Sequence, residues 1–203
     1  MKTAILIDGS FFIKRYRLIK RRTERDPDLS PTTMARDIAA CAFRWIRKAN
    51  PHGYRHRELY RIFFYDCAPE RHNAGPHPLT KEIIRIEDYL DFGFRTTLHQ
   101  ELRKQRKVAL RLGELHTKNG HWTLSEAGIK KLRQGVSPND LDSRDLYYKV
   151  KQSGVDMRIG LDIASISQNG HVDQIILVAG DSDFVPASKL ARRSGVDFIL
   201  DPM

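Results

Sequence analysis

Two carboxylates close the stretch LVAGDSDFVP, where the apolar residues 177–179 are followed by Asp181 and Asp183. Like charges one residue apart repel each other, so their pairing needs a reason in a chain with 35 Lys and Arg against 25 Asp and Glu. A second apolar run, residues 4–7, also ends in an acid, Asp8. If both runs are neighbouring parallel strands, their acids meet at the carboxyl edge of the sheet, where open α/β folds bind ligands.

Two further acids lie in the segment GVDMRIGLDIA. A helix that begins near Asp156 places Ile159, Ile163 and Ile166 in one apolar stripe, which is expected to pack on the sheet. Asp162 flanks this stripe and is therefore predicted to lean over the strand ends. Asp156 has two interpretations, since capping the helix would alone explain an acid at that position.

Several carboxylates that converge without a basic partner indicate a hard divalent cation. Mg²⁺ and Mn²⁺ prefer oxygen ligands and retain waters, which leaves room for phosphate oxygens. A bound cation polarises a phosphoryl oxygen and lowers the pKa of a bound water, as a phosphodiester hydrolase requires. The structural alternative is that each acid is only a turn or helix-cap residue. The predicted catalytic acids are Asp8, Asp162, Asp181 and Asp183, and the predicted metal ligands are these four with Asp156.

Strand-like and helical segments alternate along the chain, which predicts a parallel sheet with helices on both faces, a three-layer α/β sandwich. The predicted helices begin at Ser30-Pro31, at Thr80, near Asp156 and after Ser182. The second of them is expected to end near Gly93. The predicted strands cover residues 4–7, 59–65, 94–98, 174–178 and 197–200.

Residues 99–150 interrupt this alternation and are predicted to be a basic region inserted into a single domain of residues 1–203. Apolar and polar residues alternate from Val108 to Leu115, and Lys118-Asn119-Gly120 gives a turn signal, so a β-hairpin is expected over 108–124. A short helix capped by Ser125 should follow. Residues 103–133 carry nine Lys and Arg against two Glu.

Several function classes lack the residues they need. No run approaches the roughly 20 apolar residues of a membrane span, and an N-terminal run interrupted at Asp8 is a buried strand, not a signal peptide. Two cysteines, Cys41 and Cys67, favour a reducing cytoplasmic setting over a disulfide framework. The motif ILIDGS is similar to that of haloacid-dehalogenase phosphatases, but Leu6 stands where their nucleophilic Asp should be.

Three blocks, ILIDGSFF, GVDMRIGLDIASI and ILVAGDSDFVPASKLARRSGVDFIL, resemble the signature blocks of the NYN domain family, most closely its LabA-like branch. This family belongs to the PIN-like nucleases. The resemblance implies a central sheet of order 3-2-1-4-5 and ribonuclease activity dependent on Mg²⁺ or Mn²⁺. It also carries acidic site residues over to Asp8, Asp162, Asp181 and Asp183, with Asp156 close behind.

A net charge of +10 and a pI near 9.7 favour a polyanionic partner, most simply RNA. The segment 14–25 follows Asp8 closely and carries a net charge of +6, and the basic hairpin offers a second phosphate-binding surface. Two functions stay open: a metal-dependent ribonuclease, or a non-catalytic RNA-binding module of the same fold, with a homo-oligomer compatible with either. The residues predicted to bind RNA are Lys14, Arg15, Arg17, Arg103, Lys104, Arg106, Lys107, Lys151, Arg158 and Ser182.

Overall fold

The computed structural model describes residues 1–48, 57–71, 73–85 and 91–203. Its main sheet has the strand order β6-β5-β2-β1-β7-β8. Within this order β5, β2, β1, β7 and β8 pair in parallel with one another, and only the pairing of β6 with β5 is antiparallel. The five parallel strands follow the chain order 3-2-1-4-5, which confirms the predicted topology. The bounds are β1 Lys2–Asp8, β2 Glu58–Cys67, β5 Val108–Leu124, β6 Leu146–Ser153, β7 Gln174–Val178 and β8 Asp197–Asp201.

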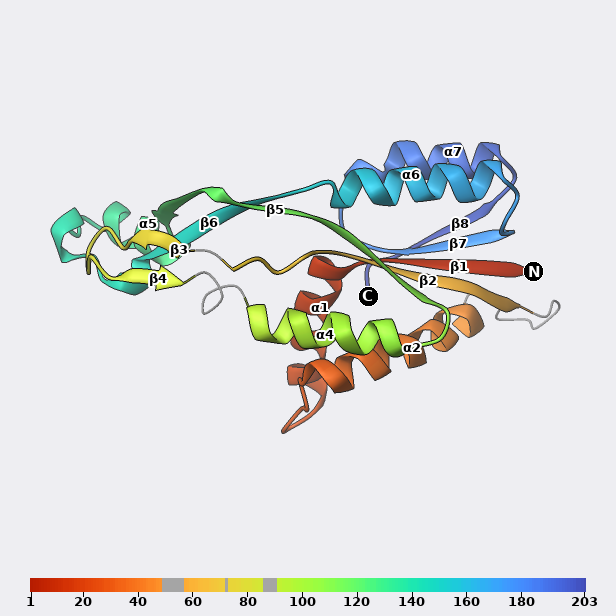
Figure 1. The fold of residues 1–203 in the computed structure, drawn as a ribbon, viewed down its shortest axis with the longest axis horizontal. Coiled ribbons are helices and arrows are strands. Elements are labelled where there is room, and N and C mark those ends of the chain that lie inside the picture. The colour runs from red at the N-terminus through yellow and green to blue at the C-terminus, as the bar shows by residue number, and fades with distance from the viewer. Residues whose placement is uncertain (49–56, 72, 86–90) are drawn as a thin grey trace.

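Helices cover both faces of the sheet (Figure 1). On one face lie α6 (Val155–Gln168) and α7 (Val185–Arg193), and on the other lie α1 (Gly9–Thr23), α2 (Pro31–Lys48) and α4 (Phe92–Lys104). The predicted three-layer α/β sandwich is therefore confirmed. No helix within the described residues combines the length and the apolarity needed to cross a bilayer.

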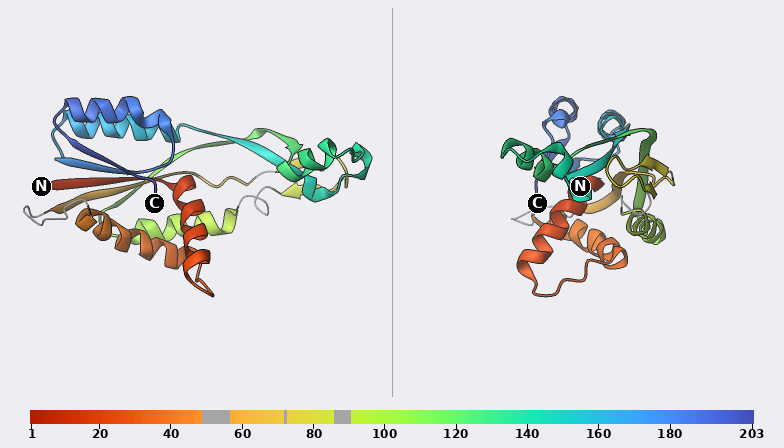
Figure 2. Two further views of the ribbon diagram at one scale, coloured as in Figure 1. Left: turned by 180° about the vertical axis from the view of Figure 1, so that it is seen from behind. Right: turned by 90° about the vertical axis from the view of Figure 1, so that its left-hand side faces the viewer.

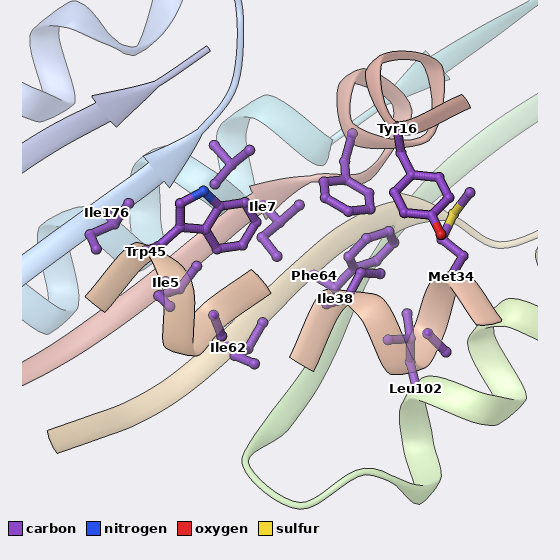
Figure 3. Packing of buried hydrophobic residues seen from close by; sticks show 14 of the residues in the cluster. Ile5, Ile7, Tyr16, Met34, Ile38, Trp45, Ile62, Phe64, Leu102 and Ile176 are labelled. Carbon is purple, nitrogen blue, oxygen red and sulfur yellow. The ribbon is translucent and has the colours of Figure 1, made fainter. Parts of the chain in front are cut away.

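Strand β1 supplies both halves of the core, because its successive side chains point to opposite faces. Ile5 and Ile7 pack with α1, α2 and α4, whereas Ala4 and Leu6 pack under α6 and α7. Figure 3 shows the first cluster, in which Trp45 of α2 lies close to β1. Such two-sided burial explains why the central strands are continuous apolar runs.

Helix α2 follows the pattern expected from its residues. Ser30 Oγ accepts a hydrogen bond from the Thr33 N–H at 3.2 Å, so it caps the helix, and Pro31 is the first helical residue. The apolar stripe is buried throughout and comprises Met34, Ile38, Ala42, Trp45 and Ile46.

The third parallel strand is not where the sequence predicts it. Residues 94–98 lie in α4, and the strand beside β2 is the first half of β5, in which Val108 pairs with Ile62. Leu98 and Leu102 are both fully buried and stand four residues apart, which is the spacing of one helical face. The segment therefore has a helical period that a five-residue window cannot reveal.

The helix predicted from Thr80 to Gly93 is also wrong in its first part. Thr80 belongs to a turn, and Ile83–Arg85 forms strand β4, which pairs antiparallel with β3 (Asn73–Pro76). His77 stabilises this turn, since its Nδ1 accepts the Leu79 and Thr80 N–H groups at 3.2 and 3.3 Å. The predicted helical residues 86–90 lie outside the described residues.

The basic region forms a long arm, here defined as residues 114–153, which extends away from the body in Figures 1 and 2. The predicted turn at 118–120 is absent, because β5 runs on to Leu124. His116 pairs with Lys151 and His121 with Lys149, so four residues of β5 oppose one of β6 in a bulge. The antiparallel partner of β5 is thus β6, more than twenty residues further along the chain.

Helix α5 (Glu126–Arg133) connects the two strands of the arm, together with short 3-10 turns at Pro138–Asp140 and Ser143–Asp145. Ser125 caps this helix as predicted, since its Oγ accepts the Gly128 N–H at 3.1 Å. Residues 99–112 belong to α4, the turn after it and the parallel part of β5, so they lie in the body. Whether the arm is an insertion into one domain stays a prediction.

Candidate active site

Strands β1 and β7 bring the first two acidic segments together. The two strands pair in parallel, with Ile7 opposite Val178, so Asp8 and the loop after β7 leave the sheet at the same edge. Asp8 is the N-cap of α1, and its Oδ1 accepts the Phe11 N–H at 3.1 Å. The half-buried carboxylate is therefore held at the junction of strand and helix.

Two glycines make this junction possible. A Cβ on Gly9 would lie 2.5 Å from the Tyr65 carbonyl oxygen, and a Cβ on Gly180 would lie 2.5 Å from the Phe11 ring. Either side chain would therefore displace backbone or a packed ring. Because both positions are glycine, α1 can begin immediately after Asp8 and pack its Phe11 ring against the loop that carries Asp181.

The two acids of this loop are exposed. Asp181 caps the 3-10 turn Ser182–Phe184, because its Oδ1 accepts the Asp183 N–H at 3.0 Å. One of its oxygens is thus used structurally, while the carboxylate of Asp183 accepts no hydrogen bond from a described residue. Capping therefore accounts for one carboxylate oxygen of Asp181, and it does not account for the carboxylate of Asp183.

Asp156 lies in the first turn of α6, and capping does not explain it. The N-cap position is Gly154 in the left-handed conformation, with φ of 78°, and it makes no side-chain cap. Asp156 is exposed, and in the part of the chain that the structure describes no group donates a hydrogen bond to it. N-capping therefore does not account for Asp156, although an acid in the first turn also interacts favourably with the helix dipole, and its role at the site stays a prediction.

The four carboxylates of Asp8, Asp156, Asp181 and Asp183 share one negative field. Burial raises the pKa of Asp8, and the charges of Asp156 and Asp66 raise it further. Burial also raises the pKa of Asp156, with added repulsion from Asp181 and Asp183. None of the four makes an ion pair with any residue that the structure describes. We refer to these four residues as the acid cluster.

The donor set of the acid cluster fits a hard divalent cation. Within the described residues, no three His, Cys, Asp or Glu side chains lie close enough to hold an ion together. Three of the four carboxylates are exposed and can rotate, and Mg²⁺ commonly needs only one or two protein carboxylates because it keeps several waters. The chemistry of these carboxylates is therefore compatible with a divalent cation that takes most of its ligands from water.

Asp162 has other partners than the sequence predicts. Its Oδ2 accepts hydrogen bonds from Tyr65 Oη at 2.8 Å and from Arg111 Nε at 3.1 Å. It comes six residues after Asp156, which places it about 9 Å further along the axis of α6. Asp162 thus ties α6 to β2 and β5. Its predicted catalytic and metal-binding roles stay predictions that this geometry does not support.

Asp66 is a buried acid whose charge reaches Asp8, and the sequence did not indicate it as a site residue. The Asp66 side chain is fully buried and pairs with Arg95 and with His99 Nε2, the latter at 2.9 Å. A signal was present, because Asp66 directly follows the predicted strand 59–65, as Asp8 follows the predicted strand 4–7. Arg95 and His99 also stand four residues apart, on one face of a helix, but that segment was predicted to be a strand.

Four of the predicted RNA-binding cations lie at the end of α4 and in the turn after it, before the start of β5, and their binding of RNA stays a prediction. They precede Val108, which pairs with Ile62 in the middle of β2. Asp8 pairs with Tyr65, three residues further along β2, which is about 10 Å at the rise of a strand. Two of the four have acidic partners, Glu101 and Glu58. The four residues are Arg103, Lys104, Arg106 and Lys107.

The remaining predicted residues lie nearer to the acids. Lys14 is exposed in the second turn of α1, Lys151 is exposed five residues before Asp156, and Arg158 is exposed on α6. Ser182 follows Asp181 directly. In contrast, Arg15 donates to the Met203 carbonyl at 2.5 Å, and Arg17 pairs with Asp91 at 2.5 Å and stacks over Phe94.

Asp8 gives a prediction about stability. Its pKa is raised in the fold, so its contribution to stability is fully present below its ordinary pKa, about 3.9, and is lost as pH rises through the raised pKa. Asp8→Asn keeps the helix cap. In EDTA at pH 7 we therefore expect a higher Tm for this variant than for the wild type, and a difference that shrinks below pH 4. Thermal melts from pH 3.5 to 8 measure this. A lower Tm at pH 7 would contradict it.

Comparison with known proteins identifies the family. Residues 2–201 match the family model of the NYN domain. No curated protein matches the chain. Among solved structures, it is similar to a crystal structure of a protein of unknown function from Vibrio parahaemolyticus RIMD 2210633, with 16% identity, coverage of 98% of this chain and 79% of that chain, and a TM-score of 0.36, which is too low to support an argument. Because the family model spans nearly the whole chain, the protein belongs to the NYN domain family, which has the PIN-like nuclease fold.

Proposed function

We propose that this protein is a ribonuclease that hydrolyses RNA phosphodiester bonds with Mg²⁺ or Mn²⁺ held by the acid cluster. The observation that supports this most directly is four neighbouring carboxylates that make no ion pair with a described residue, in a chain of net charge +10. The other two acids considered, Asp66 and Asp162, each pair with an arginine. We assign the chain, by the resemblance of its motifs, to the LabA-like branch.

The chain's own residues would position the reactants. Asp8 is held by the α1 cap, and Asp156 and Asp183 are exposed, so one or two of these carboxylates would bind a cation whose other ligands are waters. A divalent cation supplies a polarised phosphoryl oxygen and an activated water. Lys14 and Arg158 are exposed close to the acids and can hold the phosphates on either side of the scissile bond.

A second function is favoured by one observation. No three ligand side chains among the described residues lie within reach of one ion, so the same fold could bind RNA without cutting it. Such a module would retain RNA affinity with a steep dependence on salt and form no product at any metal concentration.

The two functions are separated by a cleavage assay. A 5′-labelled single-stranded RNA should yield products cut at internal positions when Mn²⁺ is present, and none in EDTA, with activity restored when Mn²⁺ is added back in excess. Asp181→Asn, prepared in parallel, should give at most a trace of these products. Salt-sensitive binding with no product in Mn²⁺ or Mg²⁺ would reject the nuclease in favour of the silent module.

A further inference from the structure

A cleft of about 240 Å³ lies where the arm joins the body. Three segments form its walls: the chain at the end of β2 (residues 67–70), the first turn of α4, and the base of the arm. From α4 come Phe92 and Arg95, and from the arm come Leu115 and most of residues 147–152. No element of the acid cluster lines this cleft, so it is a separate feature of the fold.

The walls of the cleft are mainly aromatic and aliphatic. Tyr148 is 8% exposed and is fixed by Trp122, whose ring centroid lies 5.5 Å away, whereas Tyr147 is 40% exposed and free to take a stacking partner. Phe92 adds a third ring. At the rim, Lys149 is exposed and makes no ion pair with a residue that the structure describes. Among the described residues that line it, the cleft thus combines flat apolar surfaces with the cation of Lys149 and the exposed carboxylate of Glu70.

The cleft lies within reach of the acid cluster. Strand β6 runs from it directly into α6, and Asp156 comes four residues after Gln152, a separation of at most about 14 Å. On the opposite wall, the charge of Asp156 also acts on the Cys67 thiol. Burial first, then Asp66 and more weakly Asp156, raises the pKa of its thiol to about 11. A strand of RNA at the acids would therefore meet the cleft within a few nucleotides.

Size and chemistry select the ligand. Sites for drug-sized molecules are about 300–1,000 Å³, so this smaller cleft suits a single ring system and excludes a helix. A base has an aromatic face whatever its identity, and stacking on tyrosine or phenylalanine is the usual way in which proteins hold single strands. The charge at Lys149 suits the phosphate attached to that base.

We propose that this cleft holds one unstacked base of a single-stranded RNA whose neighbouring phosphates extend to the acid cluster. The proposal rests on the proposed function for the identity of the polymer, and it adds the position at which the strand is anchored. Tyr147 is the stacking residue, and Lys149 binds the adjoining phosphate.

The test is a scan of abasic sites measured by binding. A labelled single-stranded RNA of mixed sequence is made with one abasic nucleotide at each position in turn, and affinities are measured in EDTA by fluorescence anisotropy. For the wild type we expect one position at which the loss of the base weakens binding about tenfold. In Tyr147→Ala the same position should matter less than about twofold, because the stacking contact is already lost.

Two variants control for folding and for a general loss of aromatic surface. Tyr147→Phe keeps the ring and should keep the wild-type profile. Tyr60→Ala removes a half-buried tyrosine near the start of β2, where it stacks on His171 at 6.2 Å, and should also keep the profile. A flat wild-type profile, or an unchanged peak in Tyr147→Ala, overturns the proposal.

Cleavage of the same RNAs in Mn²⁺ separates the two proposals. Cleavage with a flat binding profile rejects the base cleft and leaves the nuclease intact. A single peak that depends on Tyr147, without cleavage, supports the cleft and rejects the nuclease. Absence of RNA binding in EDTA and in Mg²⁺ rejects the cleft as an RNA site, and then a different class of ligand must occupy it.

Discussion

Asp156→Asn is expected to lower the rate of Mn²⁺-dependent RNA cleavage at least about 100-fold. The rate of Asp162→Asn is expected to stay within about threefold of the wild-type rate, which corresponds to a change of under about 1 kcal/mol in activation free energy. The two acids lie on the same helix, and each substitution removes one negative charge. Asp156 makes no ion pair with a described residue and lies in the field of Asp181 and Asp183. Asp162 is occupied by Tyr65 and Arg111. Only the first loss should remove ligand charge from the bound cation.

Single-turnover rates at saturating Mn²⁺ measure this difference, with the Tm of each variant recorded beside them. The Tyr65 hydroxyl can still donate to the amide oxygen of an asparagine, so Asp162→Asn should remain folded. Equal losses in the two variants, at unchanged Tm, would contradict the geometry described for α6. They would instead restore the role in metal binding that the sequence predicts for Asp162.

The largest effect on stability is expected from Arg95→Ala. This substitution leaves the Asp66 carboxylate, whose side chain is fully buried, with His99 as its remaining described partner. Breaking one side of a buried ion pair typically costs about 3–5 kcal/mol, because a charge stays buried without compensation. For a chain of this length the Tm should fall by roughly 10 °C.

Thermal and urea unfolding of matched variants test this expectation. Arg103→Ala on the same helix removes an exposed arginine and should change the free energy of unfolding by less than about 0.5 kcal/mol. Adding Asp66→Asn to Arg95→Ala should recover part of the loss, since the buried charge is removed. Equal stabilities of Arg95→Ala and Arg103→Ala would show that the pair contributes nothing to the fold.

The parts of the site that sequence reasoning located are those fixed by local rules. A strand buried on both faces is a continuous apolar run, so the positions of β1 and β7, and of Asp8 and Asp181 after them, could be predicted from a few residues each. Helix α6 was equally clear from the isoleucines at helical spacing. The order of the strands came from the family resemblance, because no local pattern encodes which strands are neighbours.

The parts that were predicted wrongly depend on contacts distant in sequence. Asn119-Gly120 is a favourable turn sequence, yet β5 continues past it, because β6, more than twenty residues after the end of β5, pairs with the residues on both sides of the bulge at 117–120. Residues 94–98 have a strand's composition, but Leu98 and Leu102 bury one helical face against α2. In both places tertiary packing outweighs local preference.

Charge was the least informative guide to the site. The sequence showed that cations are abundant, but not that Arg103 and Lys107 would lie at the end of α4 and in the turn after it. That position follows from the direction of α4, which starts beside Asp66 and ends at the turn before β5. Because this segment was predicted to be a strand and is a helix, the positions of these cations could not be derived from the sequence.

The rate of RNA cleavage as a function of Mn²⁺ concentration, for the wild type and Asp8→Asn purified side by side, tests the central claim most directly. Asp8→Asn keeps the helix cap and removes one ligand charge, so a difference between the two reports on the metal and not on folding. We predict a saturable rise for the wild type and a rate at least about 100-fold lower for the variant at every concentration. Equal rates, or a wild-type rate indifferent to Mn²⁺, would contradict a nuclease built on the acid cluster.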